Sequence, residues 1–208
     1  MDSYFALILY VLELFGTGAF AFTGSLAAIR HKYDLIGVII LAILTGNAGG
    51  TLRDMIVGIT PPSTLSNPAY IVVSIVVAVF VFLVFKSLGN KEKIFVIFDG
   101  IGLGVFTVTG ASVAYALMGP NLLIIVVCSS LTSIAGGIIR DIAVNEMPLV
   151  FTREIYGLAN FIGGVLYWLL VYLHVDQALV TTLCIILVTM FRLISYALNW
   201  HLPTAKNK

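Results

Sequence analysis

Hydrophobic residues along this 208-residue chain fall into seven long runs that are separated by short polar loops. A helix needs roughly 20 apolar residues to cross the hydrocarbon core of a bilayer, and each run has about that length. Most runs are apolar on every face, as expected for helices surrounded by lipid. The pattern predicts an all-α integral membrane protein with seven transmembrane helices, over 4–29, 35–58, 69–88, 94–117, 121–144, 154–173 and 177–198.

Composition supports this class and excludes others. The chain is 60% hydrophobic and 10% charged, which leaves too few polar residues to cover a soluble domain. A net charge of +1 gives no basic face for nucleic acid, so no nucleic-acid partner is expected. Cys128 and Cys184 lie inside hydrophobic runs and are interpreted as packing residues. The first run follows an acidic start and lacks the features of a cleaved signal, so it is interpreted as a retained helix.

Basic residues in the loops and the tail all fall on one side of the predicted helices. They are Arg30, Lys32, Lys86, Lys91, Lys93, Arg153, Lys206 and Lys208. Basic loops remain in the cytoplasm. We therefore expect a multi-pass protein with its N-terminus outside and its C-terminus in the cytoplasm.

An internal repeat divides the chain. The sequence "LTGNAGGTLRD" at 44–54 recurs as "LTSIAGGIIRD" at 131–141, and "ELFGTGAFAFTG" at 13–24 recurs as "DGIGLGVFTVTG" at 99–110. The offset is 87 residues for the first pair and 86 for the second. Self-similarity at a fixed offset is the signature of a duplicated structural unit.

Each copy of the repeat holds three predicted helices, and an odd number makes the second copy enter the membrane from the opposite side. The predicted architecture is therefore an inverted 3+3 repeat plus a seventh helix. The first three-helix repeat spans 1–90, and the second, inverted repeat spans 91–174. The last unit, 175–208, holds the seventh helix and a cytoplasmic tail. Such repeats place a substrate or ion site near the midplane, between interrupted helices.

Paired glycines lie just past the centres of the second and fifth predicted helices. They predict kinks that interrupt both helices, although close helix packing is the alternative interpretation. Backbone carbonyls released near Gly49 and Gly136 would bind a monovalent cation, whereas the exposed helix N-termini would suit an anion, and the sequence leaves this choice open. The expected pore and kink residues are Thr45, Ala48, Gly49, Gly50, Arg53, Asp54, Thr132, Ser133, Ala135, Gly136, Gly137, Arg140 and Asp141.

Charged residues inside the predicted helices are costly in lipid and usually functional. Estimated depths predict two ion pairs, Glu13 with Arg53 and Asp99 with Arg140. Asp54 and Asp141 follow these arginines directly in the sequence. Because neighbouring residues point to different faces of a helix, both aspartates are expected to line a water-filled path. A purely structural role for all these charges is the alternative.

Arg192 lies outside the repeat, on the seventh predicted helix. Its expected partners are Asp99 or Asp141, and the alternative is that its side chain extends to the membrane surface. No acid pair or serine-histidine pair is predicted at one depth, so we expect neither enzymatic activity nor a cofactor.

The duplicated "AGGxxRD" motif, "GTGAFAFTG" in the first helix and the three plus three plus one helices resemble the prokaryotic branch of the trimeric intracellular cation channel (TRIC) family. Bacterial relatives are also labelled as a glycine transporter domain. The resemblance implies a homotrimer in a bacterial-type cytoplasmic membrane, contacting lipids and itself, with one pore per protomer between the kinked second and fifth helices. It implies conduction of monovalent cations, chiefly K+. A transporter of small amino acids such as glycine is the alternative.

Overall fold

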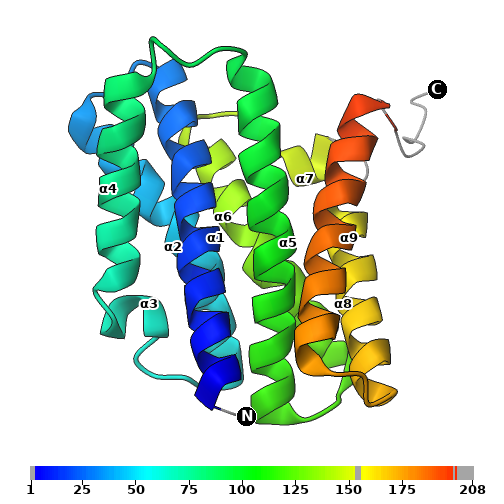
Figure 1. Ribbon diagram of the computed structural model, residues 1–208. Helices are drawn as coiled ribbons and strands as arrows, with labels where there is room; N and C mark the ends of the chain where they lie inside the picture. The colour runs from blue at the N-terminus through cyan, green and yellow to red at the C-terminus, as the bar shows by residue number, and fades with distance from the viewer. Residues whose placement is uncertain (1–2, 153–155, 199, 201–208) are drawn as a thin grey trace, which may run out of the picture.

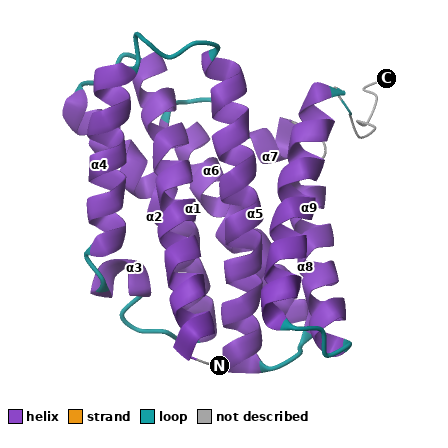
Figure 2. Cartoon of the chain, in the orientation of Figure 1, coloured by secondary structure: helices purple, strands orange, loops and turns teal. Residues whose placement is uncertain are grey.

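The computed structural model describes residues 3–152, 156–198 and 200, and all regular structure in this part of the chain is helical (Figures 1 and 2). Of the basic residues that predict the orientation, Arg153, Lys206 and Lys208 lie outside the described residues. The helices are α1 (Ser3–Arg30), α2 (Leu35–Val57), α3 (Ser63–Ser66), α4 (Ala69–Val84), α5 (Lys91–Met118), α6 (Leu122–Ala143), α7 (Leu149–Thr152), α8 (Tyr156–Tyr172) and α9 (Gln177–Ala197).

Polar residues in the loops set the starts of several helices. Asp34, Asn90, Asn121 and Asp176 each precede a helix and accept a hydrogen bond from a backbone N–H in its first turn. Such caps satisfy N–H groups that have no partner within the helix. The polar loops in the sequence therefore fix where these helices begin.

Each of the seven predicted helices corresponds to a helix of the structure. Five of these, α1, α2, α5, α6 and α9, are long and apolar enough to cross a membrane, while α4 and α8 are shorter apolar helices. The crossing of α4 and α8 stays a prediction. The four-residue helices α3 and α7 were not predicted, because they are too short to show a periodic pattern.

Four long helices form the centre of the bundle. Helices α1 and α5 pack side by side (Figure 1). Helix α1 also packs against α2, α5 packs against α6, and α2 packs against α6. Helix α4 lies at one edge of the bundle, and α8 and α9 lie at the other. Chain direction alternates, so that α1 and α5 run in opposite directions (Figure 1).

The prediction that glycines interrupt two helices is wrong. Helix α2 continues through Gly49 and Gly50, and α6 continues through Gly136 and Gly137. Glycine costs only about 1 kcal/mol relative to alanine inside a helix, so tertiary packing readily keeps the helix intact. Carbonyls are therefore not released at these positions. A bend that preserves the helical hydrogen bonds stays a prediction.

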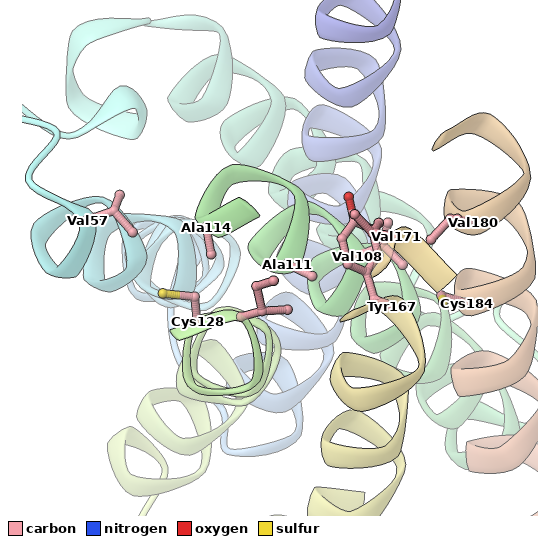
Figure 3. Close-up of a cluster of buried hydrophobic side chains, with 10 residues drawn as sticks. Val57, Val108, Ala111, Ala114, Cys128, Tyr167, Val171, Val180 and Cys184 are labelled. Atoms are coloured by element: carbon pink, nitrogen blue, oxygen red, sulfur yellow. The ribbon is translucent and has the colours of Figure 1, made fainter. Parts of the chain in front are cut away.

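Both cysteines are packing residues, as predicted. Cys128 and Cys184 are free thiols in a buried apolar cluster that α5, α6, α8 and α9 share with the end of α2 (Figure 3). Tyr167 reaches into the same cluster, and its hydroxyl oxygen accepts a hydrogen bond from the Ser112 hydroxyl at 2.9 Å. This cluster fixes α8 and α9 against the central helices.

Candidate ion-conduction site

Helices α2 and α6 cross where each presents a glycine to the other. A Cβ atom on Gly49 would lie 1.9 Å from the carbonyl oxygen of Thr132, and one on Gly136 would lie 2.1 Å from that of Thr45. Neither position has room for any side chain. The alternative interpretation of the paired glycines, close packing between helices, is therefore confirmed for Gly49 and Gly136.

The hydroxyl groups at this crossing bond within their own helices. Thr45 donates to the carbonyl of Leu41 and Thr132 to that of Cys128, both at 2.6 Å. Ser133 donates to the carbonyl of Ser129 at 2.9 Å. Because each hydroxyl has a single proton, only the lone pairs of these oxygens remain for a ligand.

Two buried groups of charges lie on opposite sides of this crossing. The Arg53 cluster consists of Glu13, Arg53, Asp54 and Tyr70, from α1, α2 and α4. Arg53 pairs with Glu13, which confirms the first predicted ion pair, and its Nε donates to Asp54 Oδ1 at 2.9 Å. The Tyr70 hydroxyl donates to Glu13 Oε2 at 2.6 Å. The arginine is 2% exposed, so this network satisfies a charge that would otherwise be very costly.

The Arg140 cluster consists of Thr23, Asp99, Arg140, Asp141 and Arg192. Arg140 Nη1 lies 3.1 Å from Asp99 Oδ1, which confirms the second predicted ion pair. The same nitrogen donates to Thr23 Oγ1 at 3.0 Å, and Nε donates to Asp141 Oδ1 at 2.8 Å. Arg140 and Asp99 are both fully buried. One guanidinium thus ties α1, α5 and α6 together.

Asp54 and Asp141 do not both line a water-filled path. Each carboxylate turns back to the arginine before it, and its second oxygen accepts a backbone N–H beyond the helix end, from Ser63 at 2.7 Å and Leu149 at 2.9 Å. The prediction failed for Asp54, because Arg53 is long enough to reach its neighbour despite the helical angle between them. Asp54 is fully buried. Asp141 lines a cavity.

Arg192 pairs with Asp99, one of the two partners expected from the sequence. Its Nε lies 3.5 Å from Asp99 Oδ2, and the residue is 4% exposed. It also lines a cavity of about 330 Å³ between the C-terminal ends of α1, α6 and α9 and the start of α5, together with Arg30, His31 and Asp141. This cavity was not foreseen, because a space between helix ends leaves no mark in the sequence.

Sequence reasoning also missed two residues that complete the clusters. Thr23 belongs to the repeated motif and matches Thr109, so its recurrence was an available signal. Tyr70 and Tyr156 share the same offset of 86 residues, which would have pointed to Tyr70. Both were overlooked because neither carries a charge.

The Tyr70 hydrogen bond has a measurable consequence. We expect Tyr70→Phe to lower the free energy of unfolding by about 1–3 kcal/mol, because it leaves a buried carboxylate oxygen without its donor. For a chain of this size, each kcal/mol corresponds to roughly 2–4 °C in melting temperature. Thermal unfolding in detergent measures the change. Tyr4→Phe is the control, since Tyr4 is 82% exposed; equal melting of Tyr70→Phe and wild type would contradict the role of this bond.

The regular structure of the described residues is all helical, and two arginine-centred ion networks are buried between the helices. This fold and this site define a multi-pass membrane protein. Residues 10–86 and 96–172 each match the family model described as glycine transporter. The chain belongs to this family.

Curated relatives have similar lengths. An UPF0126 inner membrane protein, YadS of Escherichia coli, is 32% identical over 199 residues, covering 94% of both chains. An UPF0126 membrane protein of Vibrio cholerae is 34% identical over 196 residues, covering 94% of this chain and 81% of the relative. The chain is thus similar to bacterial membrane proteins over nearly its whole length.

Solved structures with the same fold include prokaryotic TRIC channels. A TRIC orthologue from Rhodobacter sphaeroides superposes with a TM-score of 0.88 at 30% identity, covering 93% of this chain and 99% of that one. A prokaryotic TRIC channel studied in 0.5 M KCl gives a TM-score of 0.86 at 34% identity, covering 95% and 100%. The predicted resemblance to TRIC channels is confirmed, and the likeness is to channels and not to enzymes.

Proposed function

We propose that this protein is a homotrimeric channel for monovalent cations, chiefly K+, with one pore per protomer between α2 and α6. The likeness to prokaryotic TRIC channels carries this proposal, because it spans 93–95% of the chain at 30–34% identity. Relatives this similar in sequence and backbone commonly share their mode of action, and the buried charges of this chain agree with a conducted cation.

Charge supports a cation over an anion. The Arg53 cluster holds two carboxylates to one guanidinium, so it carries an excess negative charge inside the protein. Intact helices α2 and α6 present no N-terminal ends at the crossing, which removes the feature expected to attract an anion. The hydroxyl lone pairs of Thr45, Thr132 and Ser133 are polar groups at the crossing, and lone pairs favour a cation.

We propose that the α2–α6 crossing is the constriction of this pore. The contacts at Gly49 and Gly136 bring backbone against backbone, so conduction requires the two helices to separate there. An ion cluster lies on each side of the crossing. The predicted residues at the crossing, around Gly49 and Gly136, keep a pore role as part of the proposal, whereas Asp54, which is buried against Arg53, does not.

The inverted 3+3 repeat, the three-unit division and the outward N-terminus also belong to the proposal. Opposite directions of α1 and α5 support an inverted second copy. The two segments that match the same family model begin 86 residues apart, as the sequence repeat does. Loops rich in basic residues support a cytoplasmic location for the loop between α4 and α5.

Purified protein in planar bilayers tests the channel. We expect unitary currents in symmetric KCl, and a reversal potential that shifts toward the K+ equilibrium potential when a KCl gradient is applied. The molar mass of the detergent-solubilised protein, measured by light scattering, should equal three chains. Protein-free bilayers and heat-denatured protein are the controls. An absence of unitary currents from folded trimers would reject the proposal.

Transport of a small amino acid is the second candidate. The family model that matches both halves is described as glycine transporter, and the cavity holds both a carboxylate, Asp141, and a guanidinium, Arg192. These two groups could hold the ends of a zwitterion. Saturable uptake of labelled glycine into proteoliposomes, without unitary currents, would favour this candidate over the channel.

A further inference from the structure

Phe20 of α1 fills a space between glycines of two neighbouring helices. A Cβ atom on Gly102 of α5 would lie 2.3 Å from Phe20 Cδ1, and one on Gly136 of α6 would lie 3.2 Å from Phe20 Cδ2. The phenyl ring therefore rests on α5 with one edge and reaches α6 with the other. Gly136 is also the glycine whose Cβ would lie 2.1 Å from the Thr45 carbonyl oxygen of α2. The ring thus lies beside the α2–α6 crossing.

A second contact holds α1 against α6 one turn further along. Thr23 donates to the carbonyl oxygen of Phe20 at 2.9 Å, and the same hydroxyl oxygen accepts from Arg140 Nη1 at 3.0 Å. Arg140 follows Gly136 by about one helical turn. Phe20 and Thr23 therefore meet α6 at two successive turns, through an apolar ring and through a hydroxyl group. This double contact fixes the position of the ring relative to the crossing.

The repeat supplies a matching phenylalanine in a different setting. Phe106 of α5 matches Phe20, and the two rings meet edge to face with their centres 5.1 Å apart. Thr109 matches Thr23, but its buried hydroxyl group has no hydrogen-bond partner in the part of the chain that the structure describes. Phe106 therefore supports the ring of Phe20, and Phe20 is the side chain that is anchored at the crossing.

The ring has no polar atom to offer to an ion. Phe20 is 1% exposed and belongs to a buried apolar cluster with Leu103 and Val188. When α2 and α6 separate at the crossing, the gap between them opens beside this ring. Narrow apolar constrictions exclude water, and an ion cannot enter without water or oxygen ligands in its place. The ring therefore opposes wetting of the gap.

We propose that Phe20 is an apolar gate of the pore, which keeps the gap between α2 and α6 free of water and ions until the helices have moved apart. This inference rests on the proposed channel function. It also gives the repeated "GTGAFAFTG" segment a role, since this segment supplies both the phenylalanine and the threonine that anchors it. A polar side chain at this position should ease the entry of water, and the current should rise.

Two variants of the same shape separate polarity from size. Valine and threonine differ only in a methyl and a hydroxyl group, so Phe20→Val and Phe20→Thr lose the ring alike. In single-channel recordings in symmetric KCl, we expect the time-averaged current of F20T to exceed that of F20V by about twofold to tenfold, the gain from one hydrogen bond to passing water. Buried helices of this chain accept threonine, as at Thr23.

The same two substitutions at Phe22 are the control. Phe22 is also buried in α1, but its ring stacks on Phe98 of α5 with the centres 4.0 Å apart, and it belongs to a different apolar cluster. Loss of that ring removes a similar packing contact. We therefore expect Phe22→Val and Phe22→Thr to carry equal currents. Thermal unfolding in detergent checks that each variant is folded.

Each outcome separates this inference from the channel itself. Absence of current from wild type rejects the proposed function. Wild-type current together with equal currents of F20V and F20T overturns the gate, as does a matching difference between the two Phe22 variants. If the variants of Phe20 do not fold, Gly102→Ala is decisive, because its methyl would displace the ring toward Gly136. Its current should fall below that of wild type, and an unchanged or larger current overturns the proposal.

Discussion

Gly49→Ala is expected to lower the free energy of unfolding by about 3 kcal/mol or more. Overpacking a core usually costs about 1–3 kcal/mol, and here the added methyl would lie 1.9 Å from a backbone carbonyl oxygen. A backbone atom cannot rotate away as a side chain can, so α2 and α6 must separate. At roughly 2–4 °C per kcal/mol, thermal unfolding in detergent should show a drop of about 6–12 °C.

The pairing of contacts across the crossing supplies a replicate and a control. Gly136→Ala should destabilise by a similar amount, because its methyl would lie 2.1 Å from the Thr45 carbonyl oxygen. Gly18→Ala also adds a methyl inside a helix, but its nearest neighbour is a Val73 methyl at 3.6 Å, an ordinary contact. Equal melting temperatures for G49A and G18A would show that the two helices are not in backbone contact.

Arg140→Gln is expected to destabilise the fold by about 3–5 kcal/mol, the usual cost of leaving a buried charge without its partner. The guanidinium bonds Asp99 and Asp141 from separate nitrogens and also reaches Thr23. Arg140→Lys should recover only part of this loss, because an ammonium lacks the planar fork that spans two carboxylates. Thermal unfolding of the two variants measures both effects.

A double variant identifies the source of the loss. Asp99 pairs with both Arg140 and Arg192, so adding Asp99→Asn to R140Q removes an interaction with Arg140 that is already lost, and we expect the loss in D99N/R140Q to be smaller than the sum of the two single losses. Non-additivity of this kind is the signature of a direct charge pair. Arg30→Gln removes an exposed arginine at the same end of the bundle and should change stability little. Additive losses in the double variant would contradict direct coupling.

Depth along the predicted helices was sufficient to predict both buried ion pairs. Glu13 and Asp99 occupy one position of the duplicated pattern, and Arg53 and Arg140 occupy another. Depth along a helix follows from residue count at 1.5 Å per residue, so each acid could be assigned to the arginine at its own depth. Charges in an apolar segment are rare enough that few partners compete.

The state of the glycine pairs could not be predicted in the same way. A glycine pair is compatible with an interrupted helix, a bend or a close crossing, and local propensities differ by only about 1 kcal/mol. The contact between Gly49 and Thr132 joins residues more than 80 positions apart. Whether that contact exists depends on how α2 and α6 cross, which no local pattern records.

The sequence by itself determined the helical membrane class, the duplicated unit and the residues that carry charge into the apolar interior. Each of these follows from hydrophobicity and repetition, which are properties of the chain alone. Only the tertiary structure decided that α2 and α6 stay intact, that Asp54 and Asp141 turn back to their arginines, and that Arg192 of α9 completes one cluster. These outcomes depend on backbone approach and side-chain reach between distant helices, and packing fixes such distances only when the whole bundle has formed.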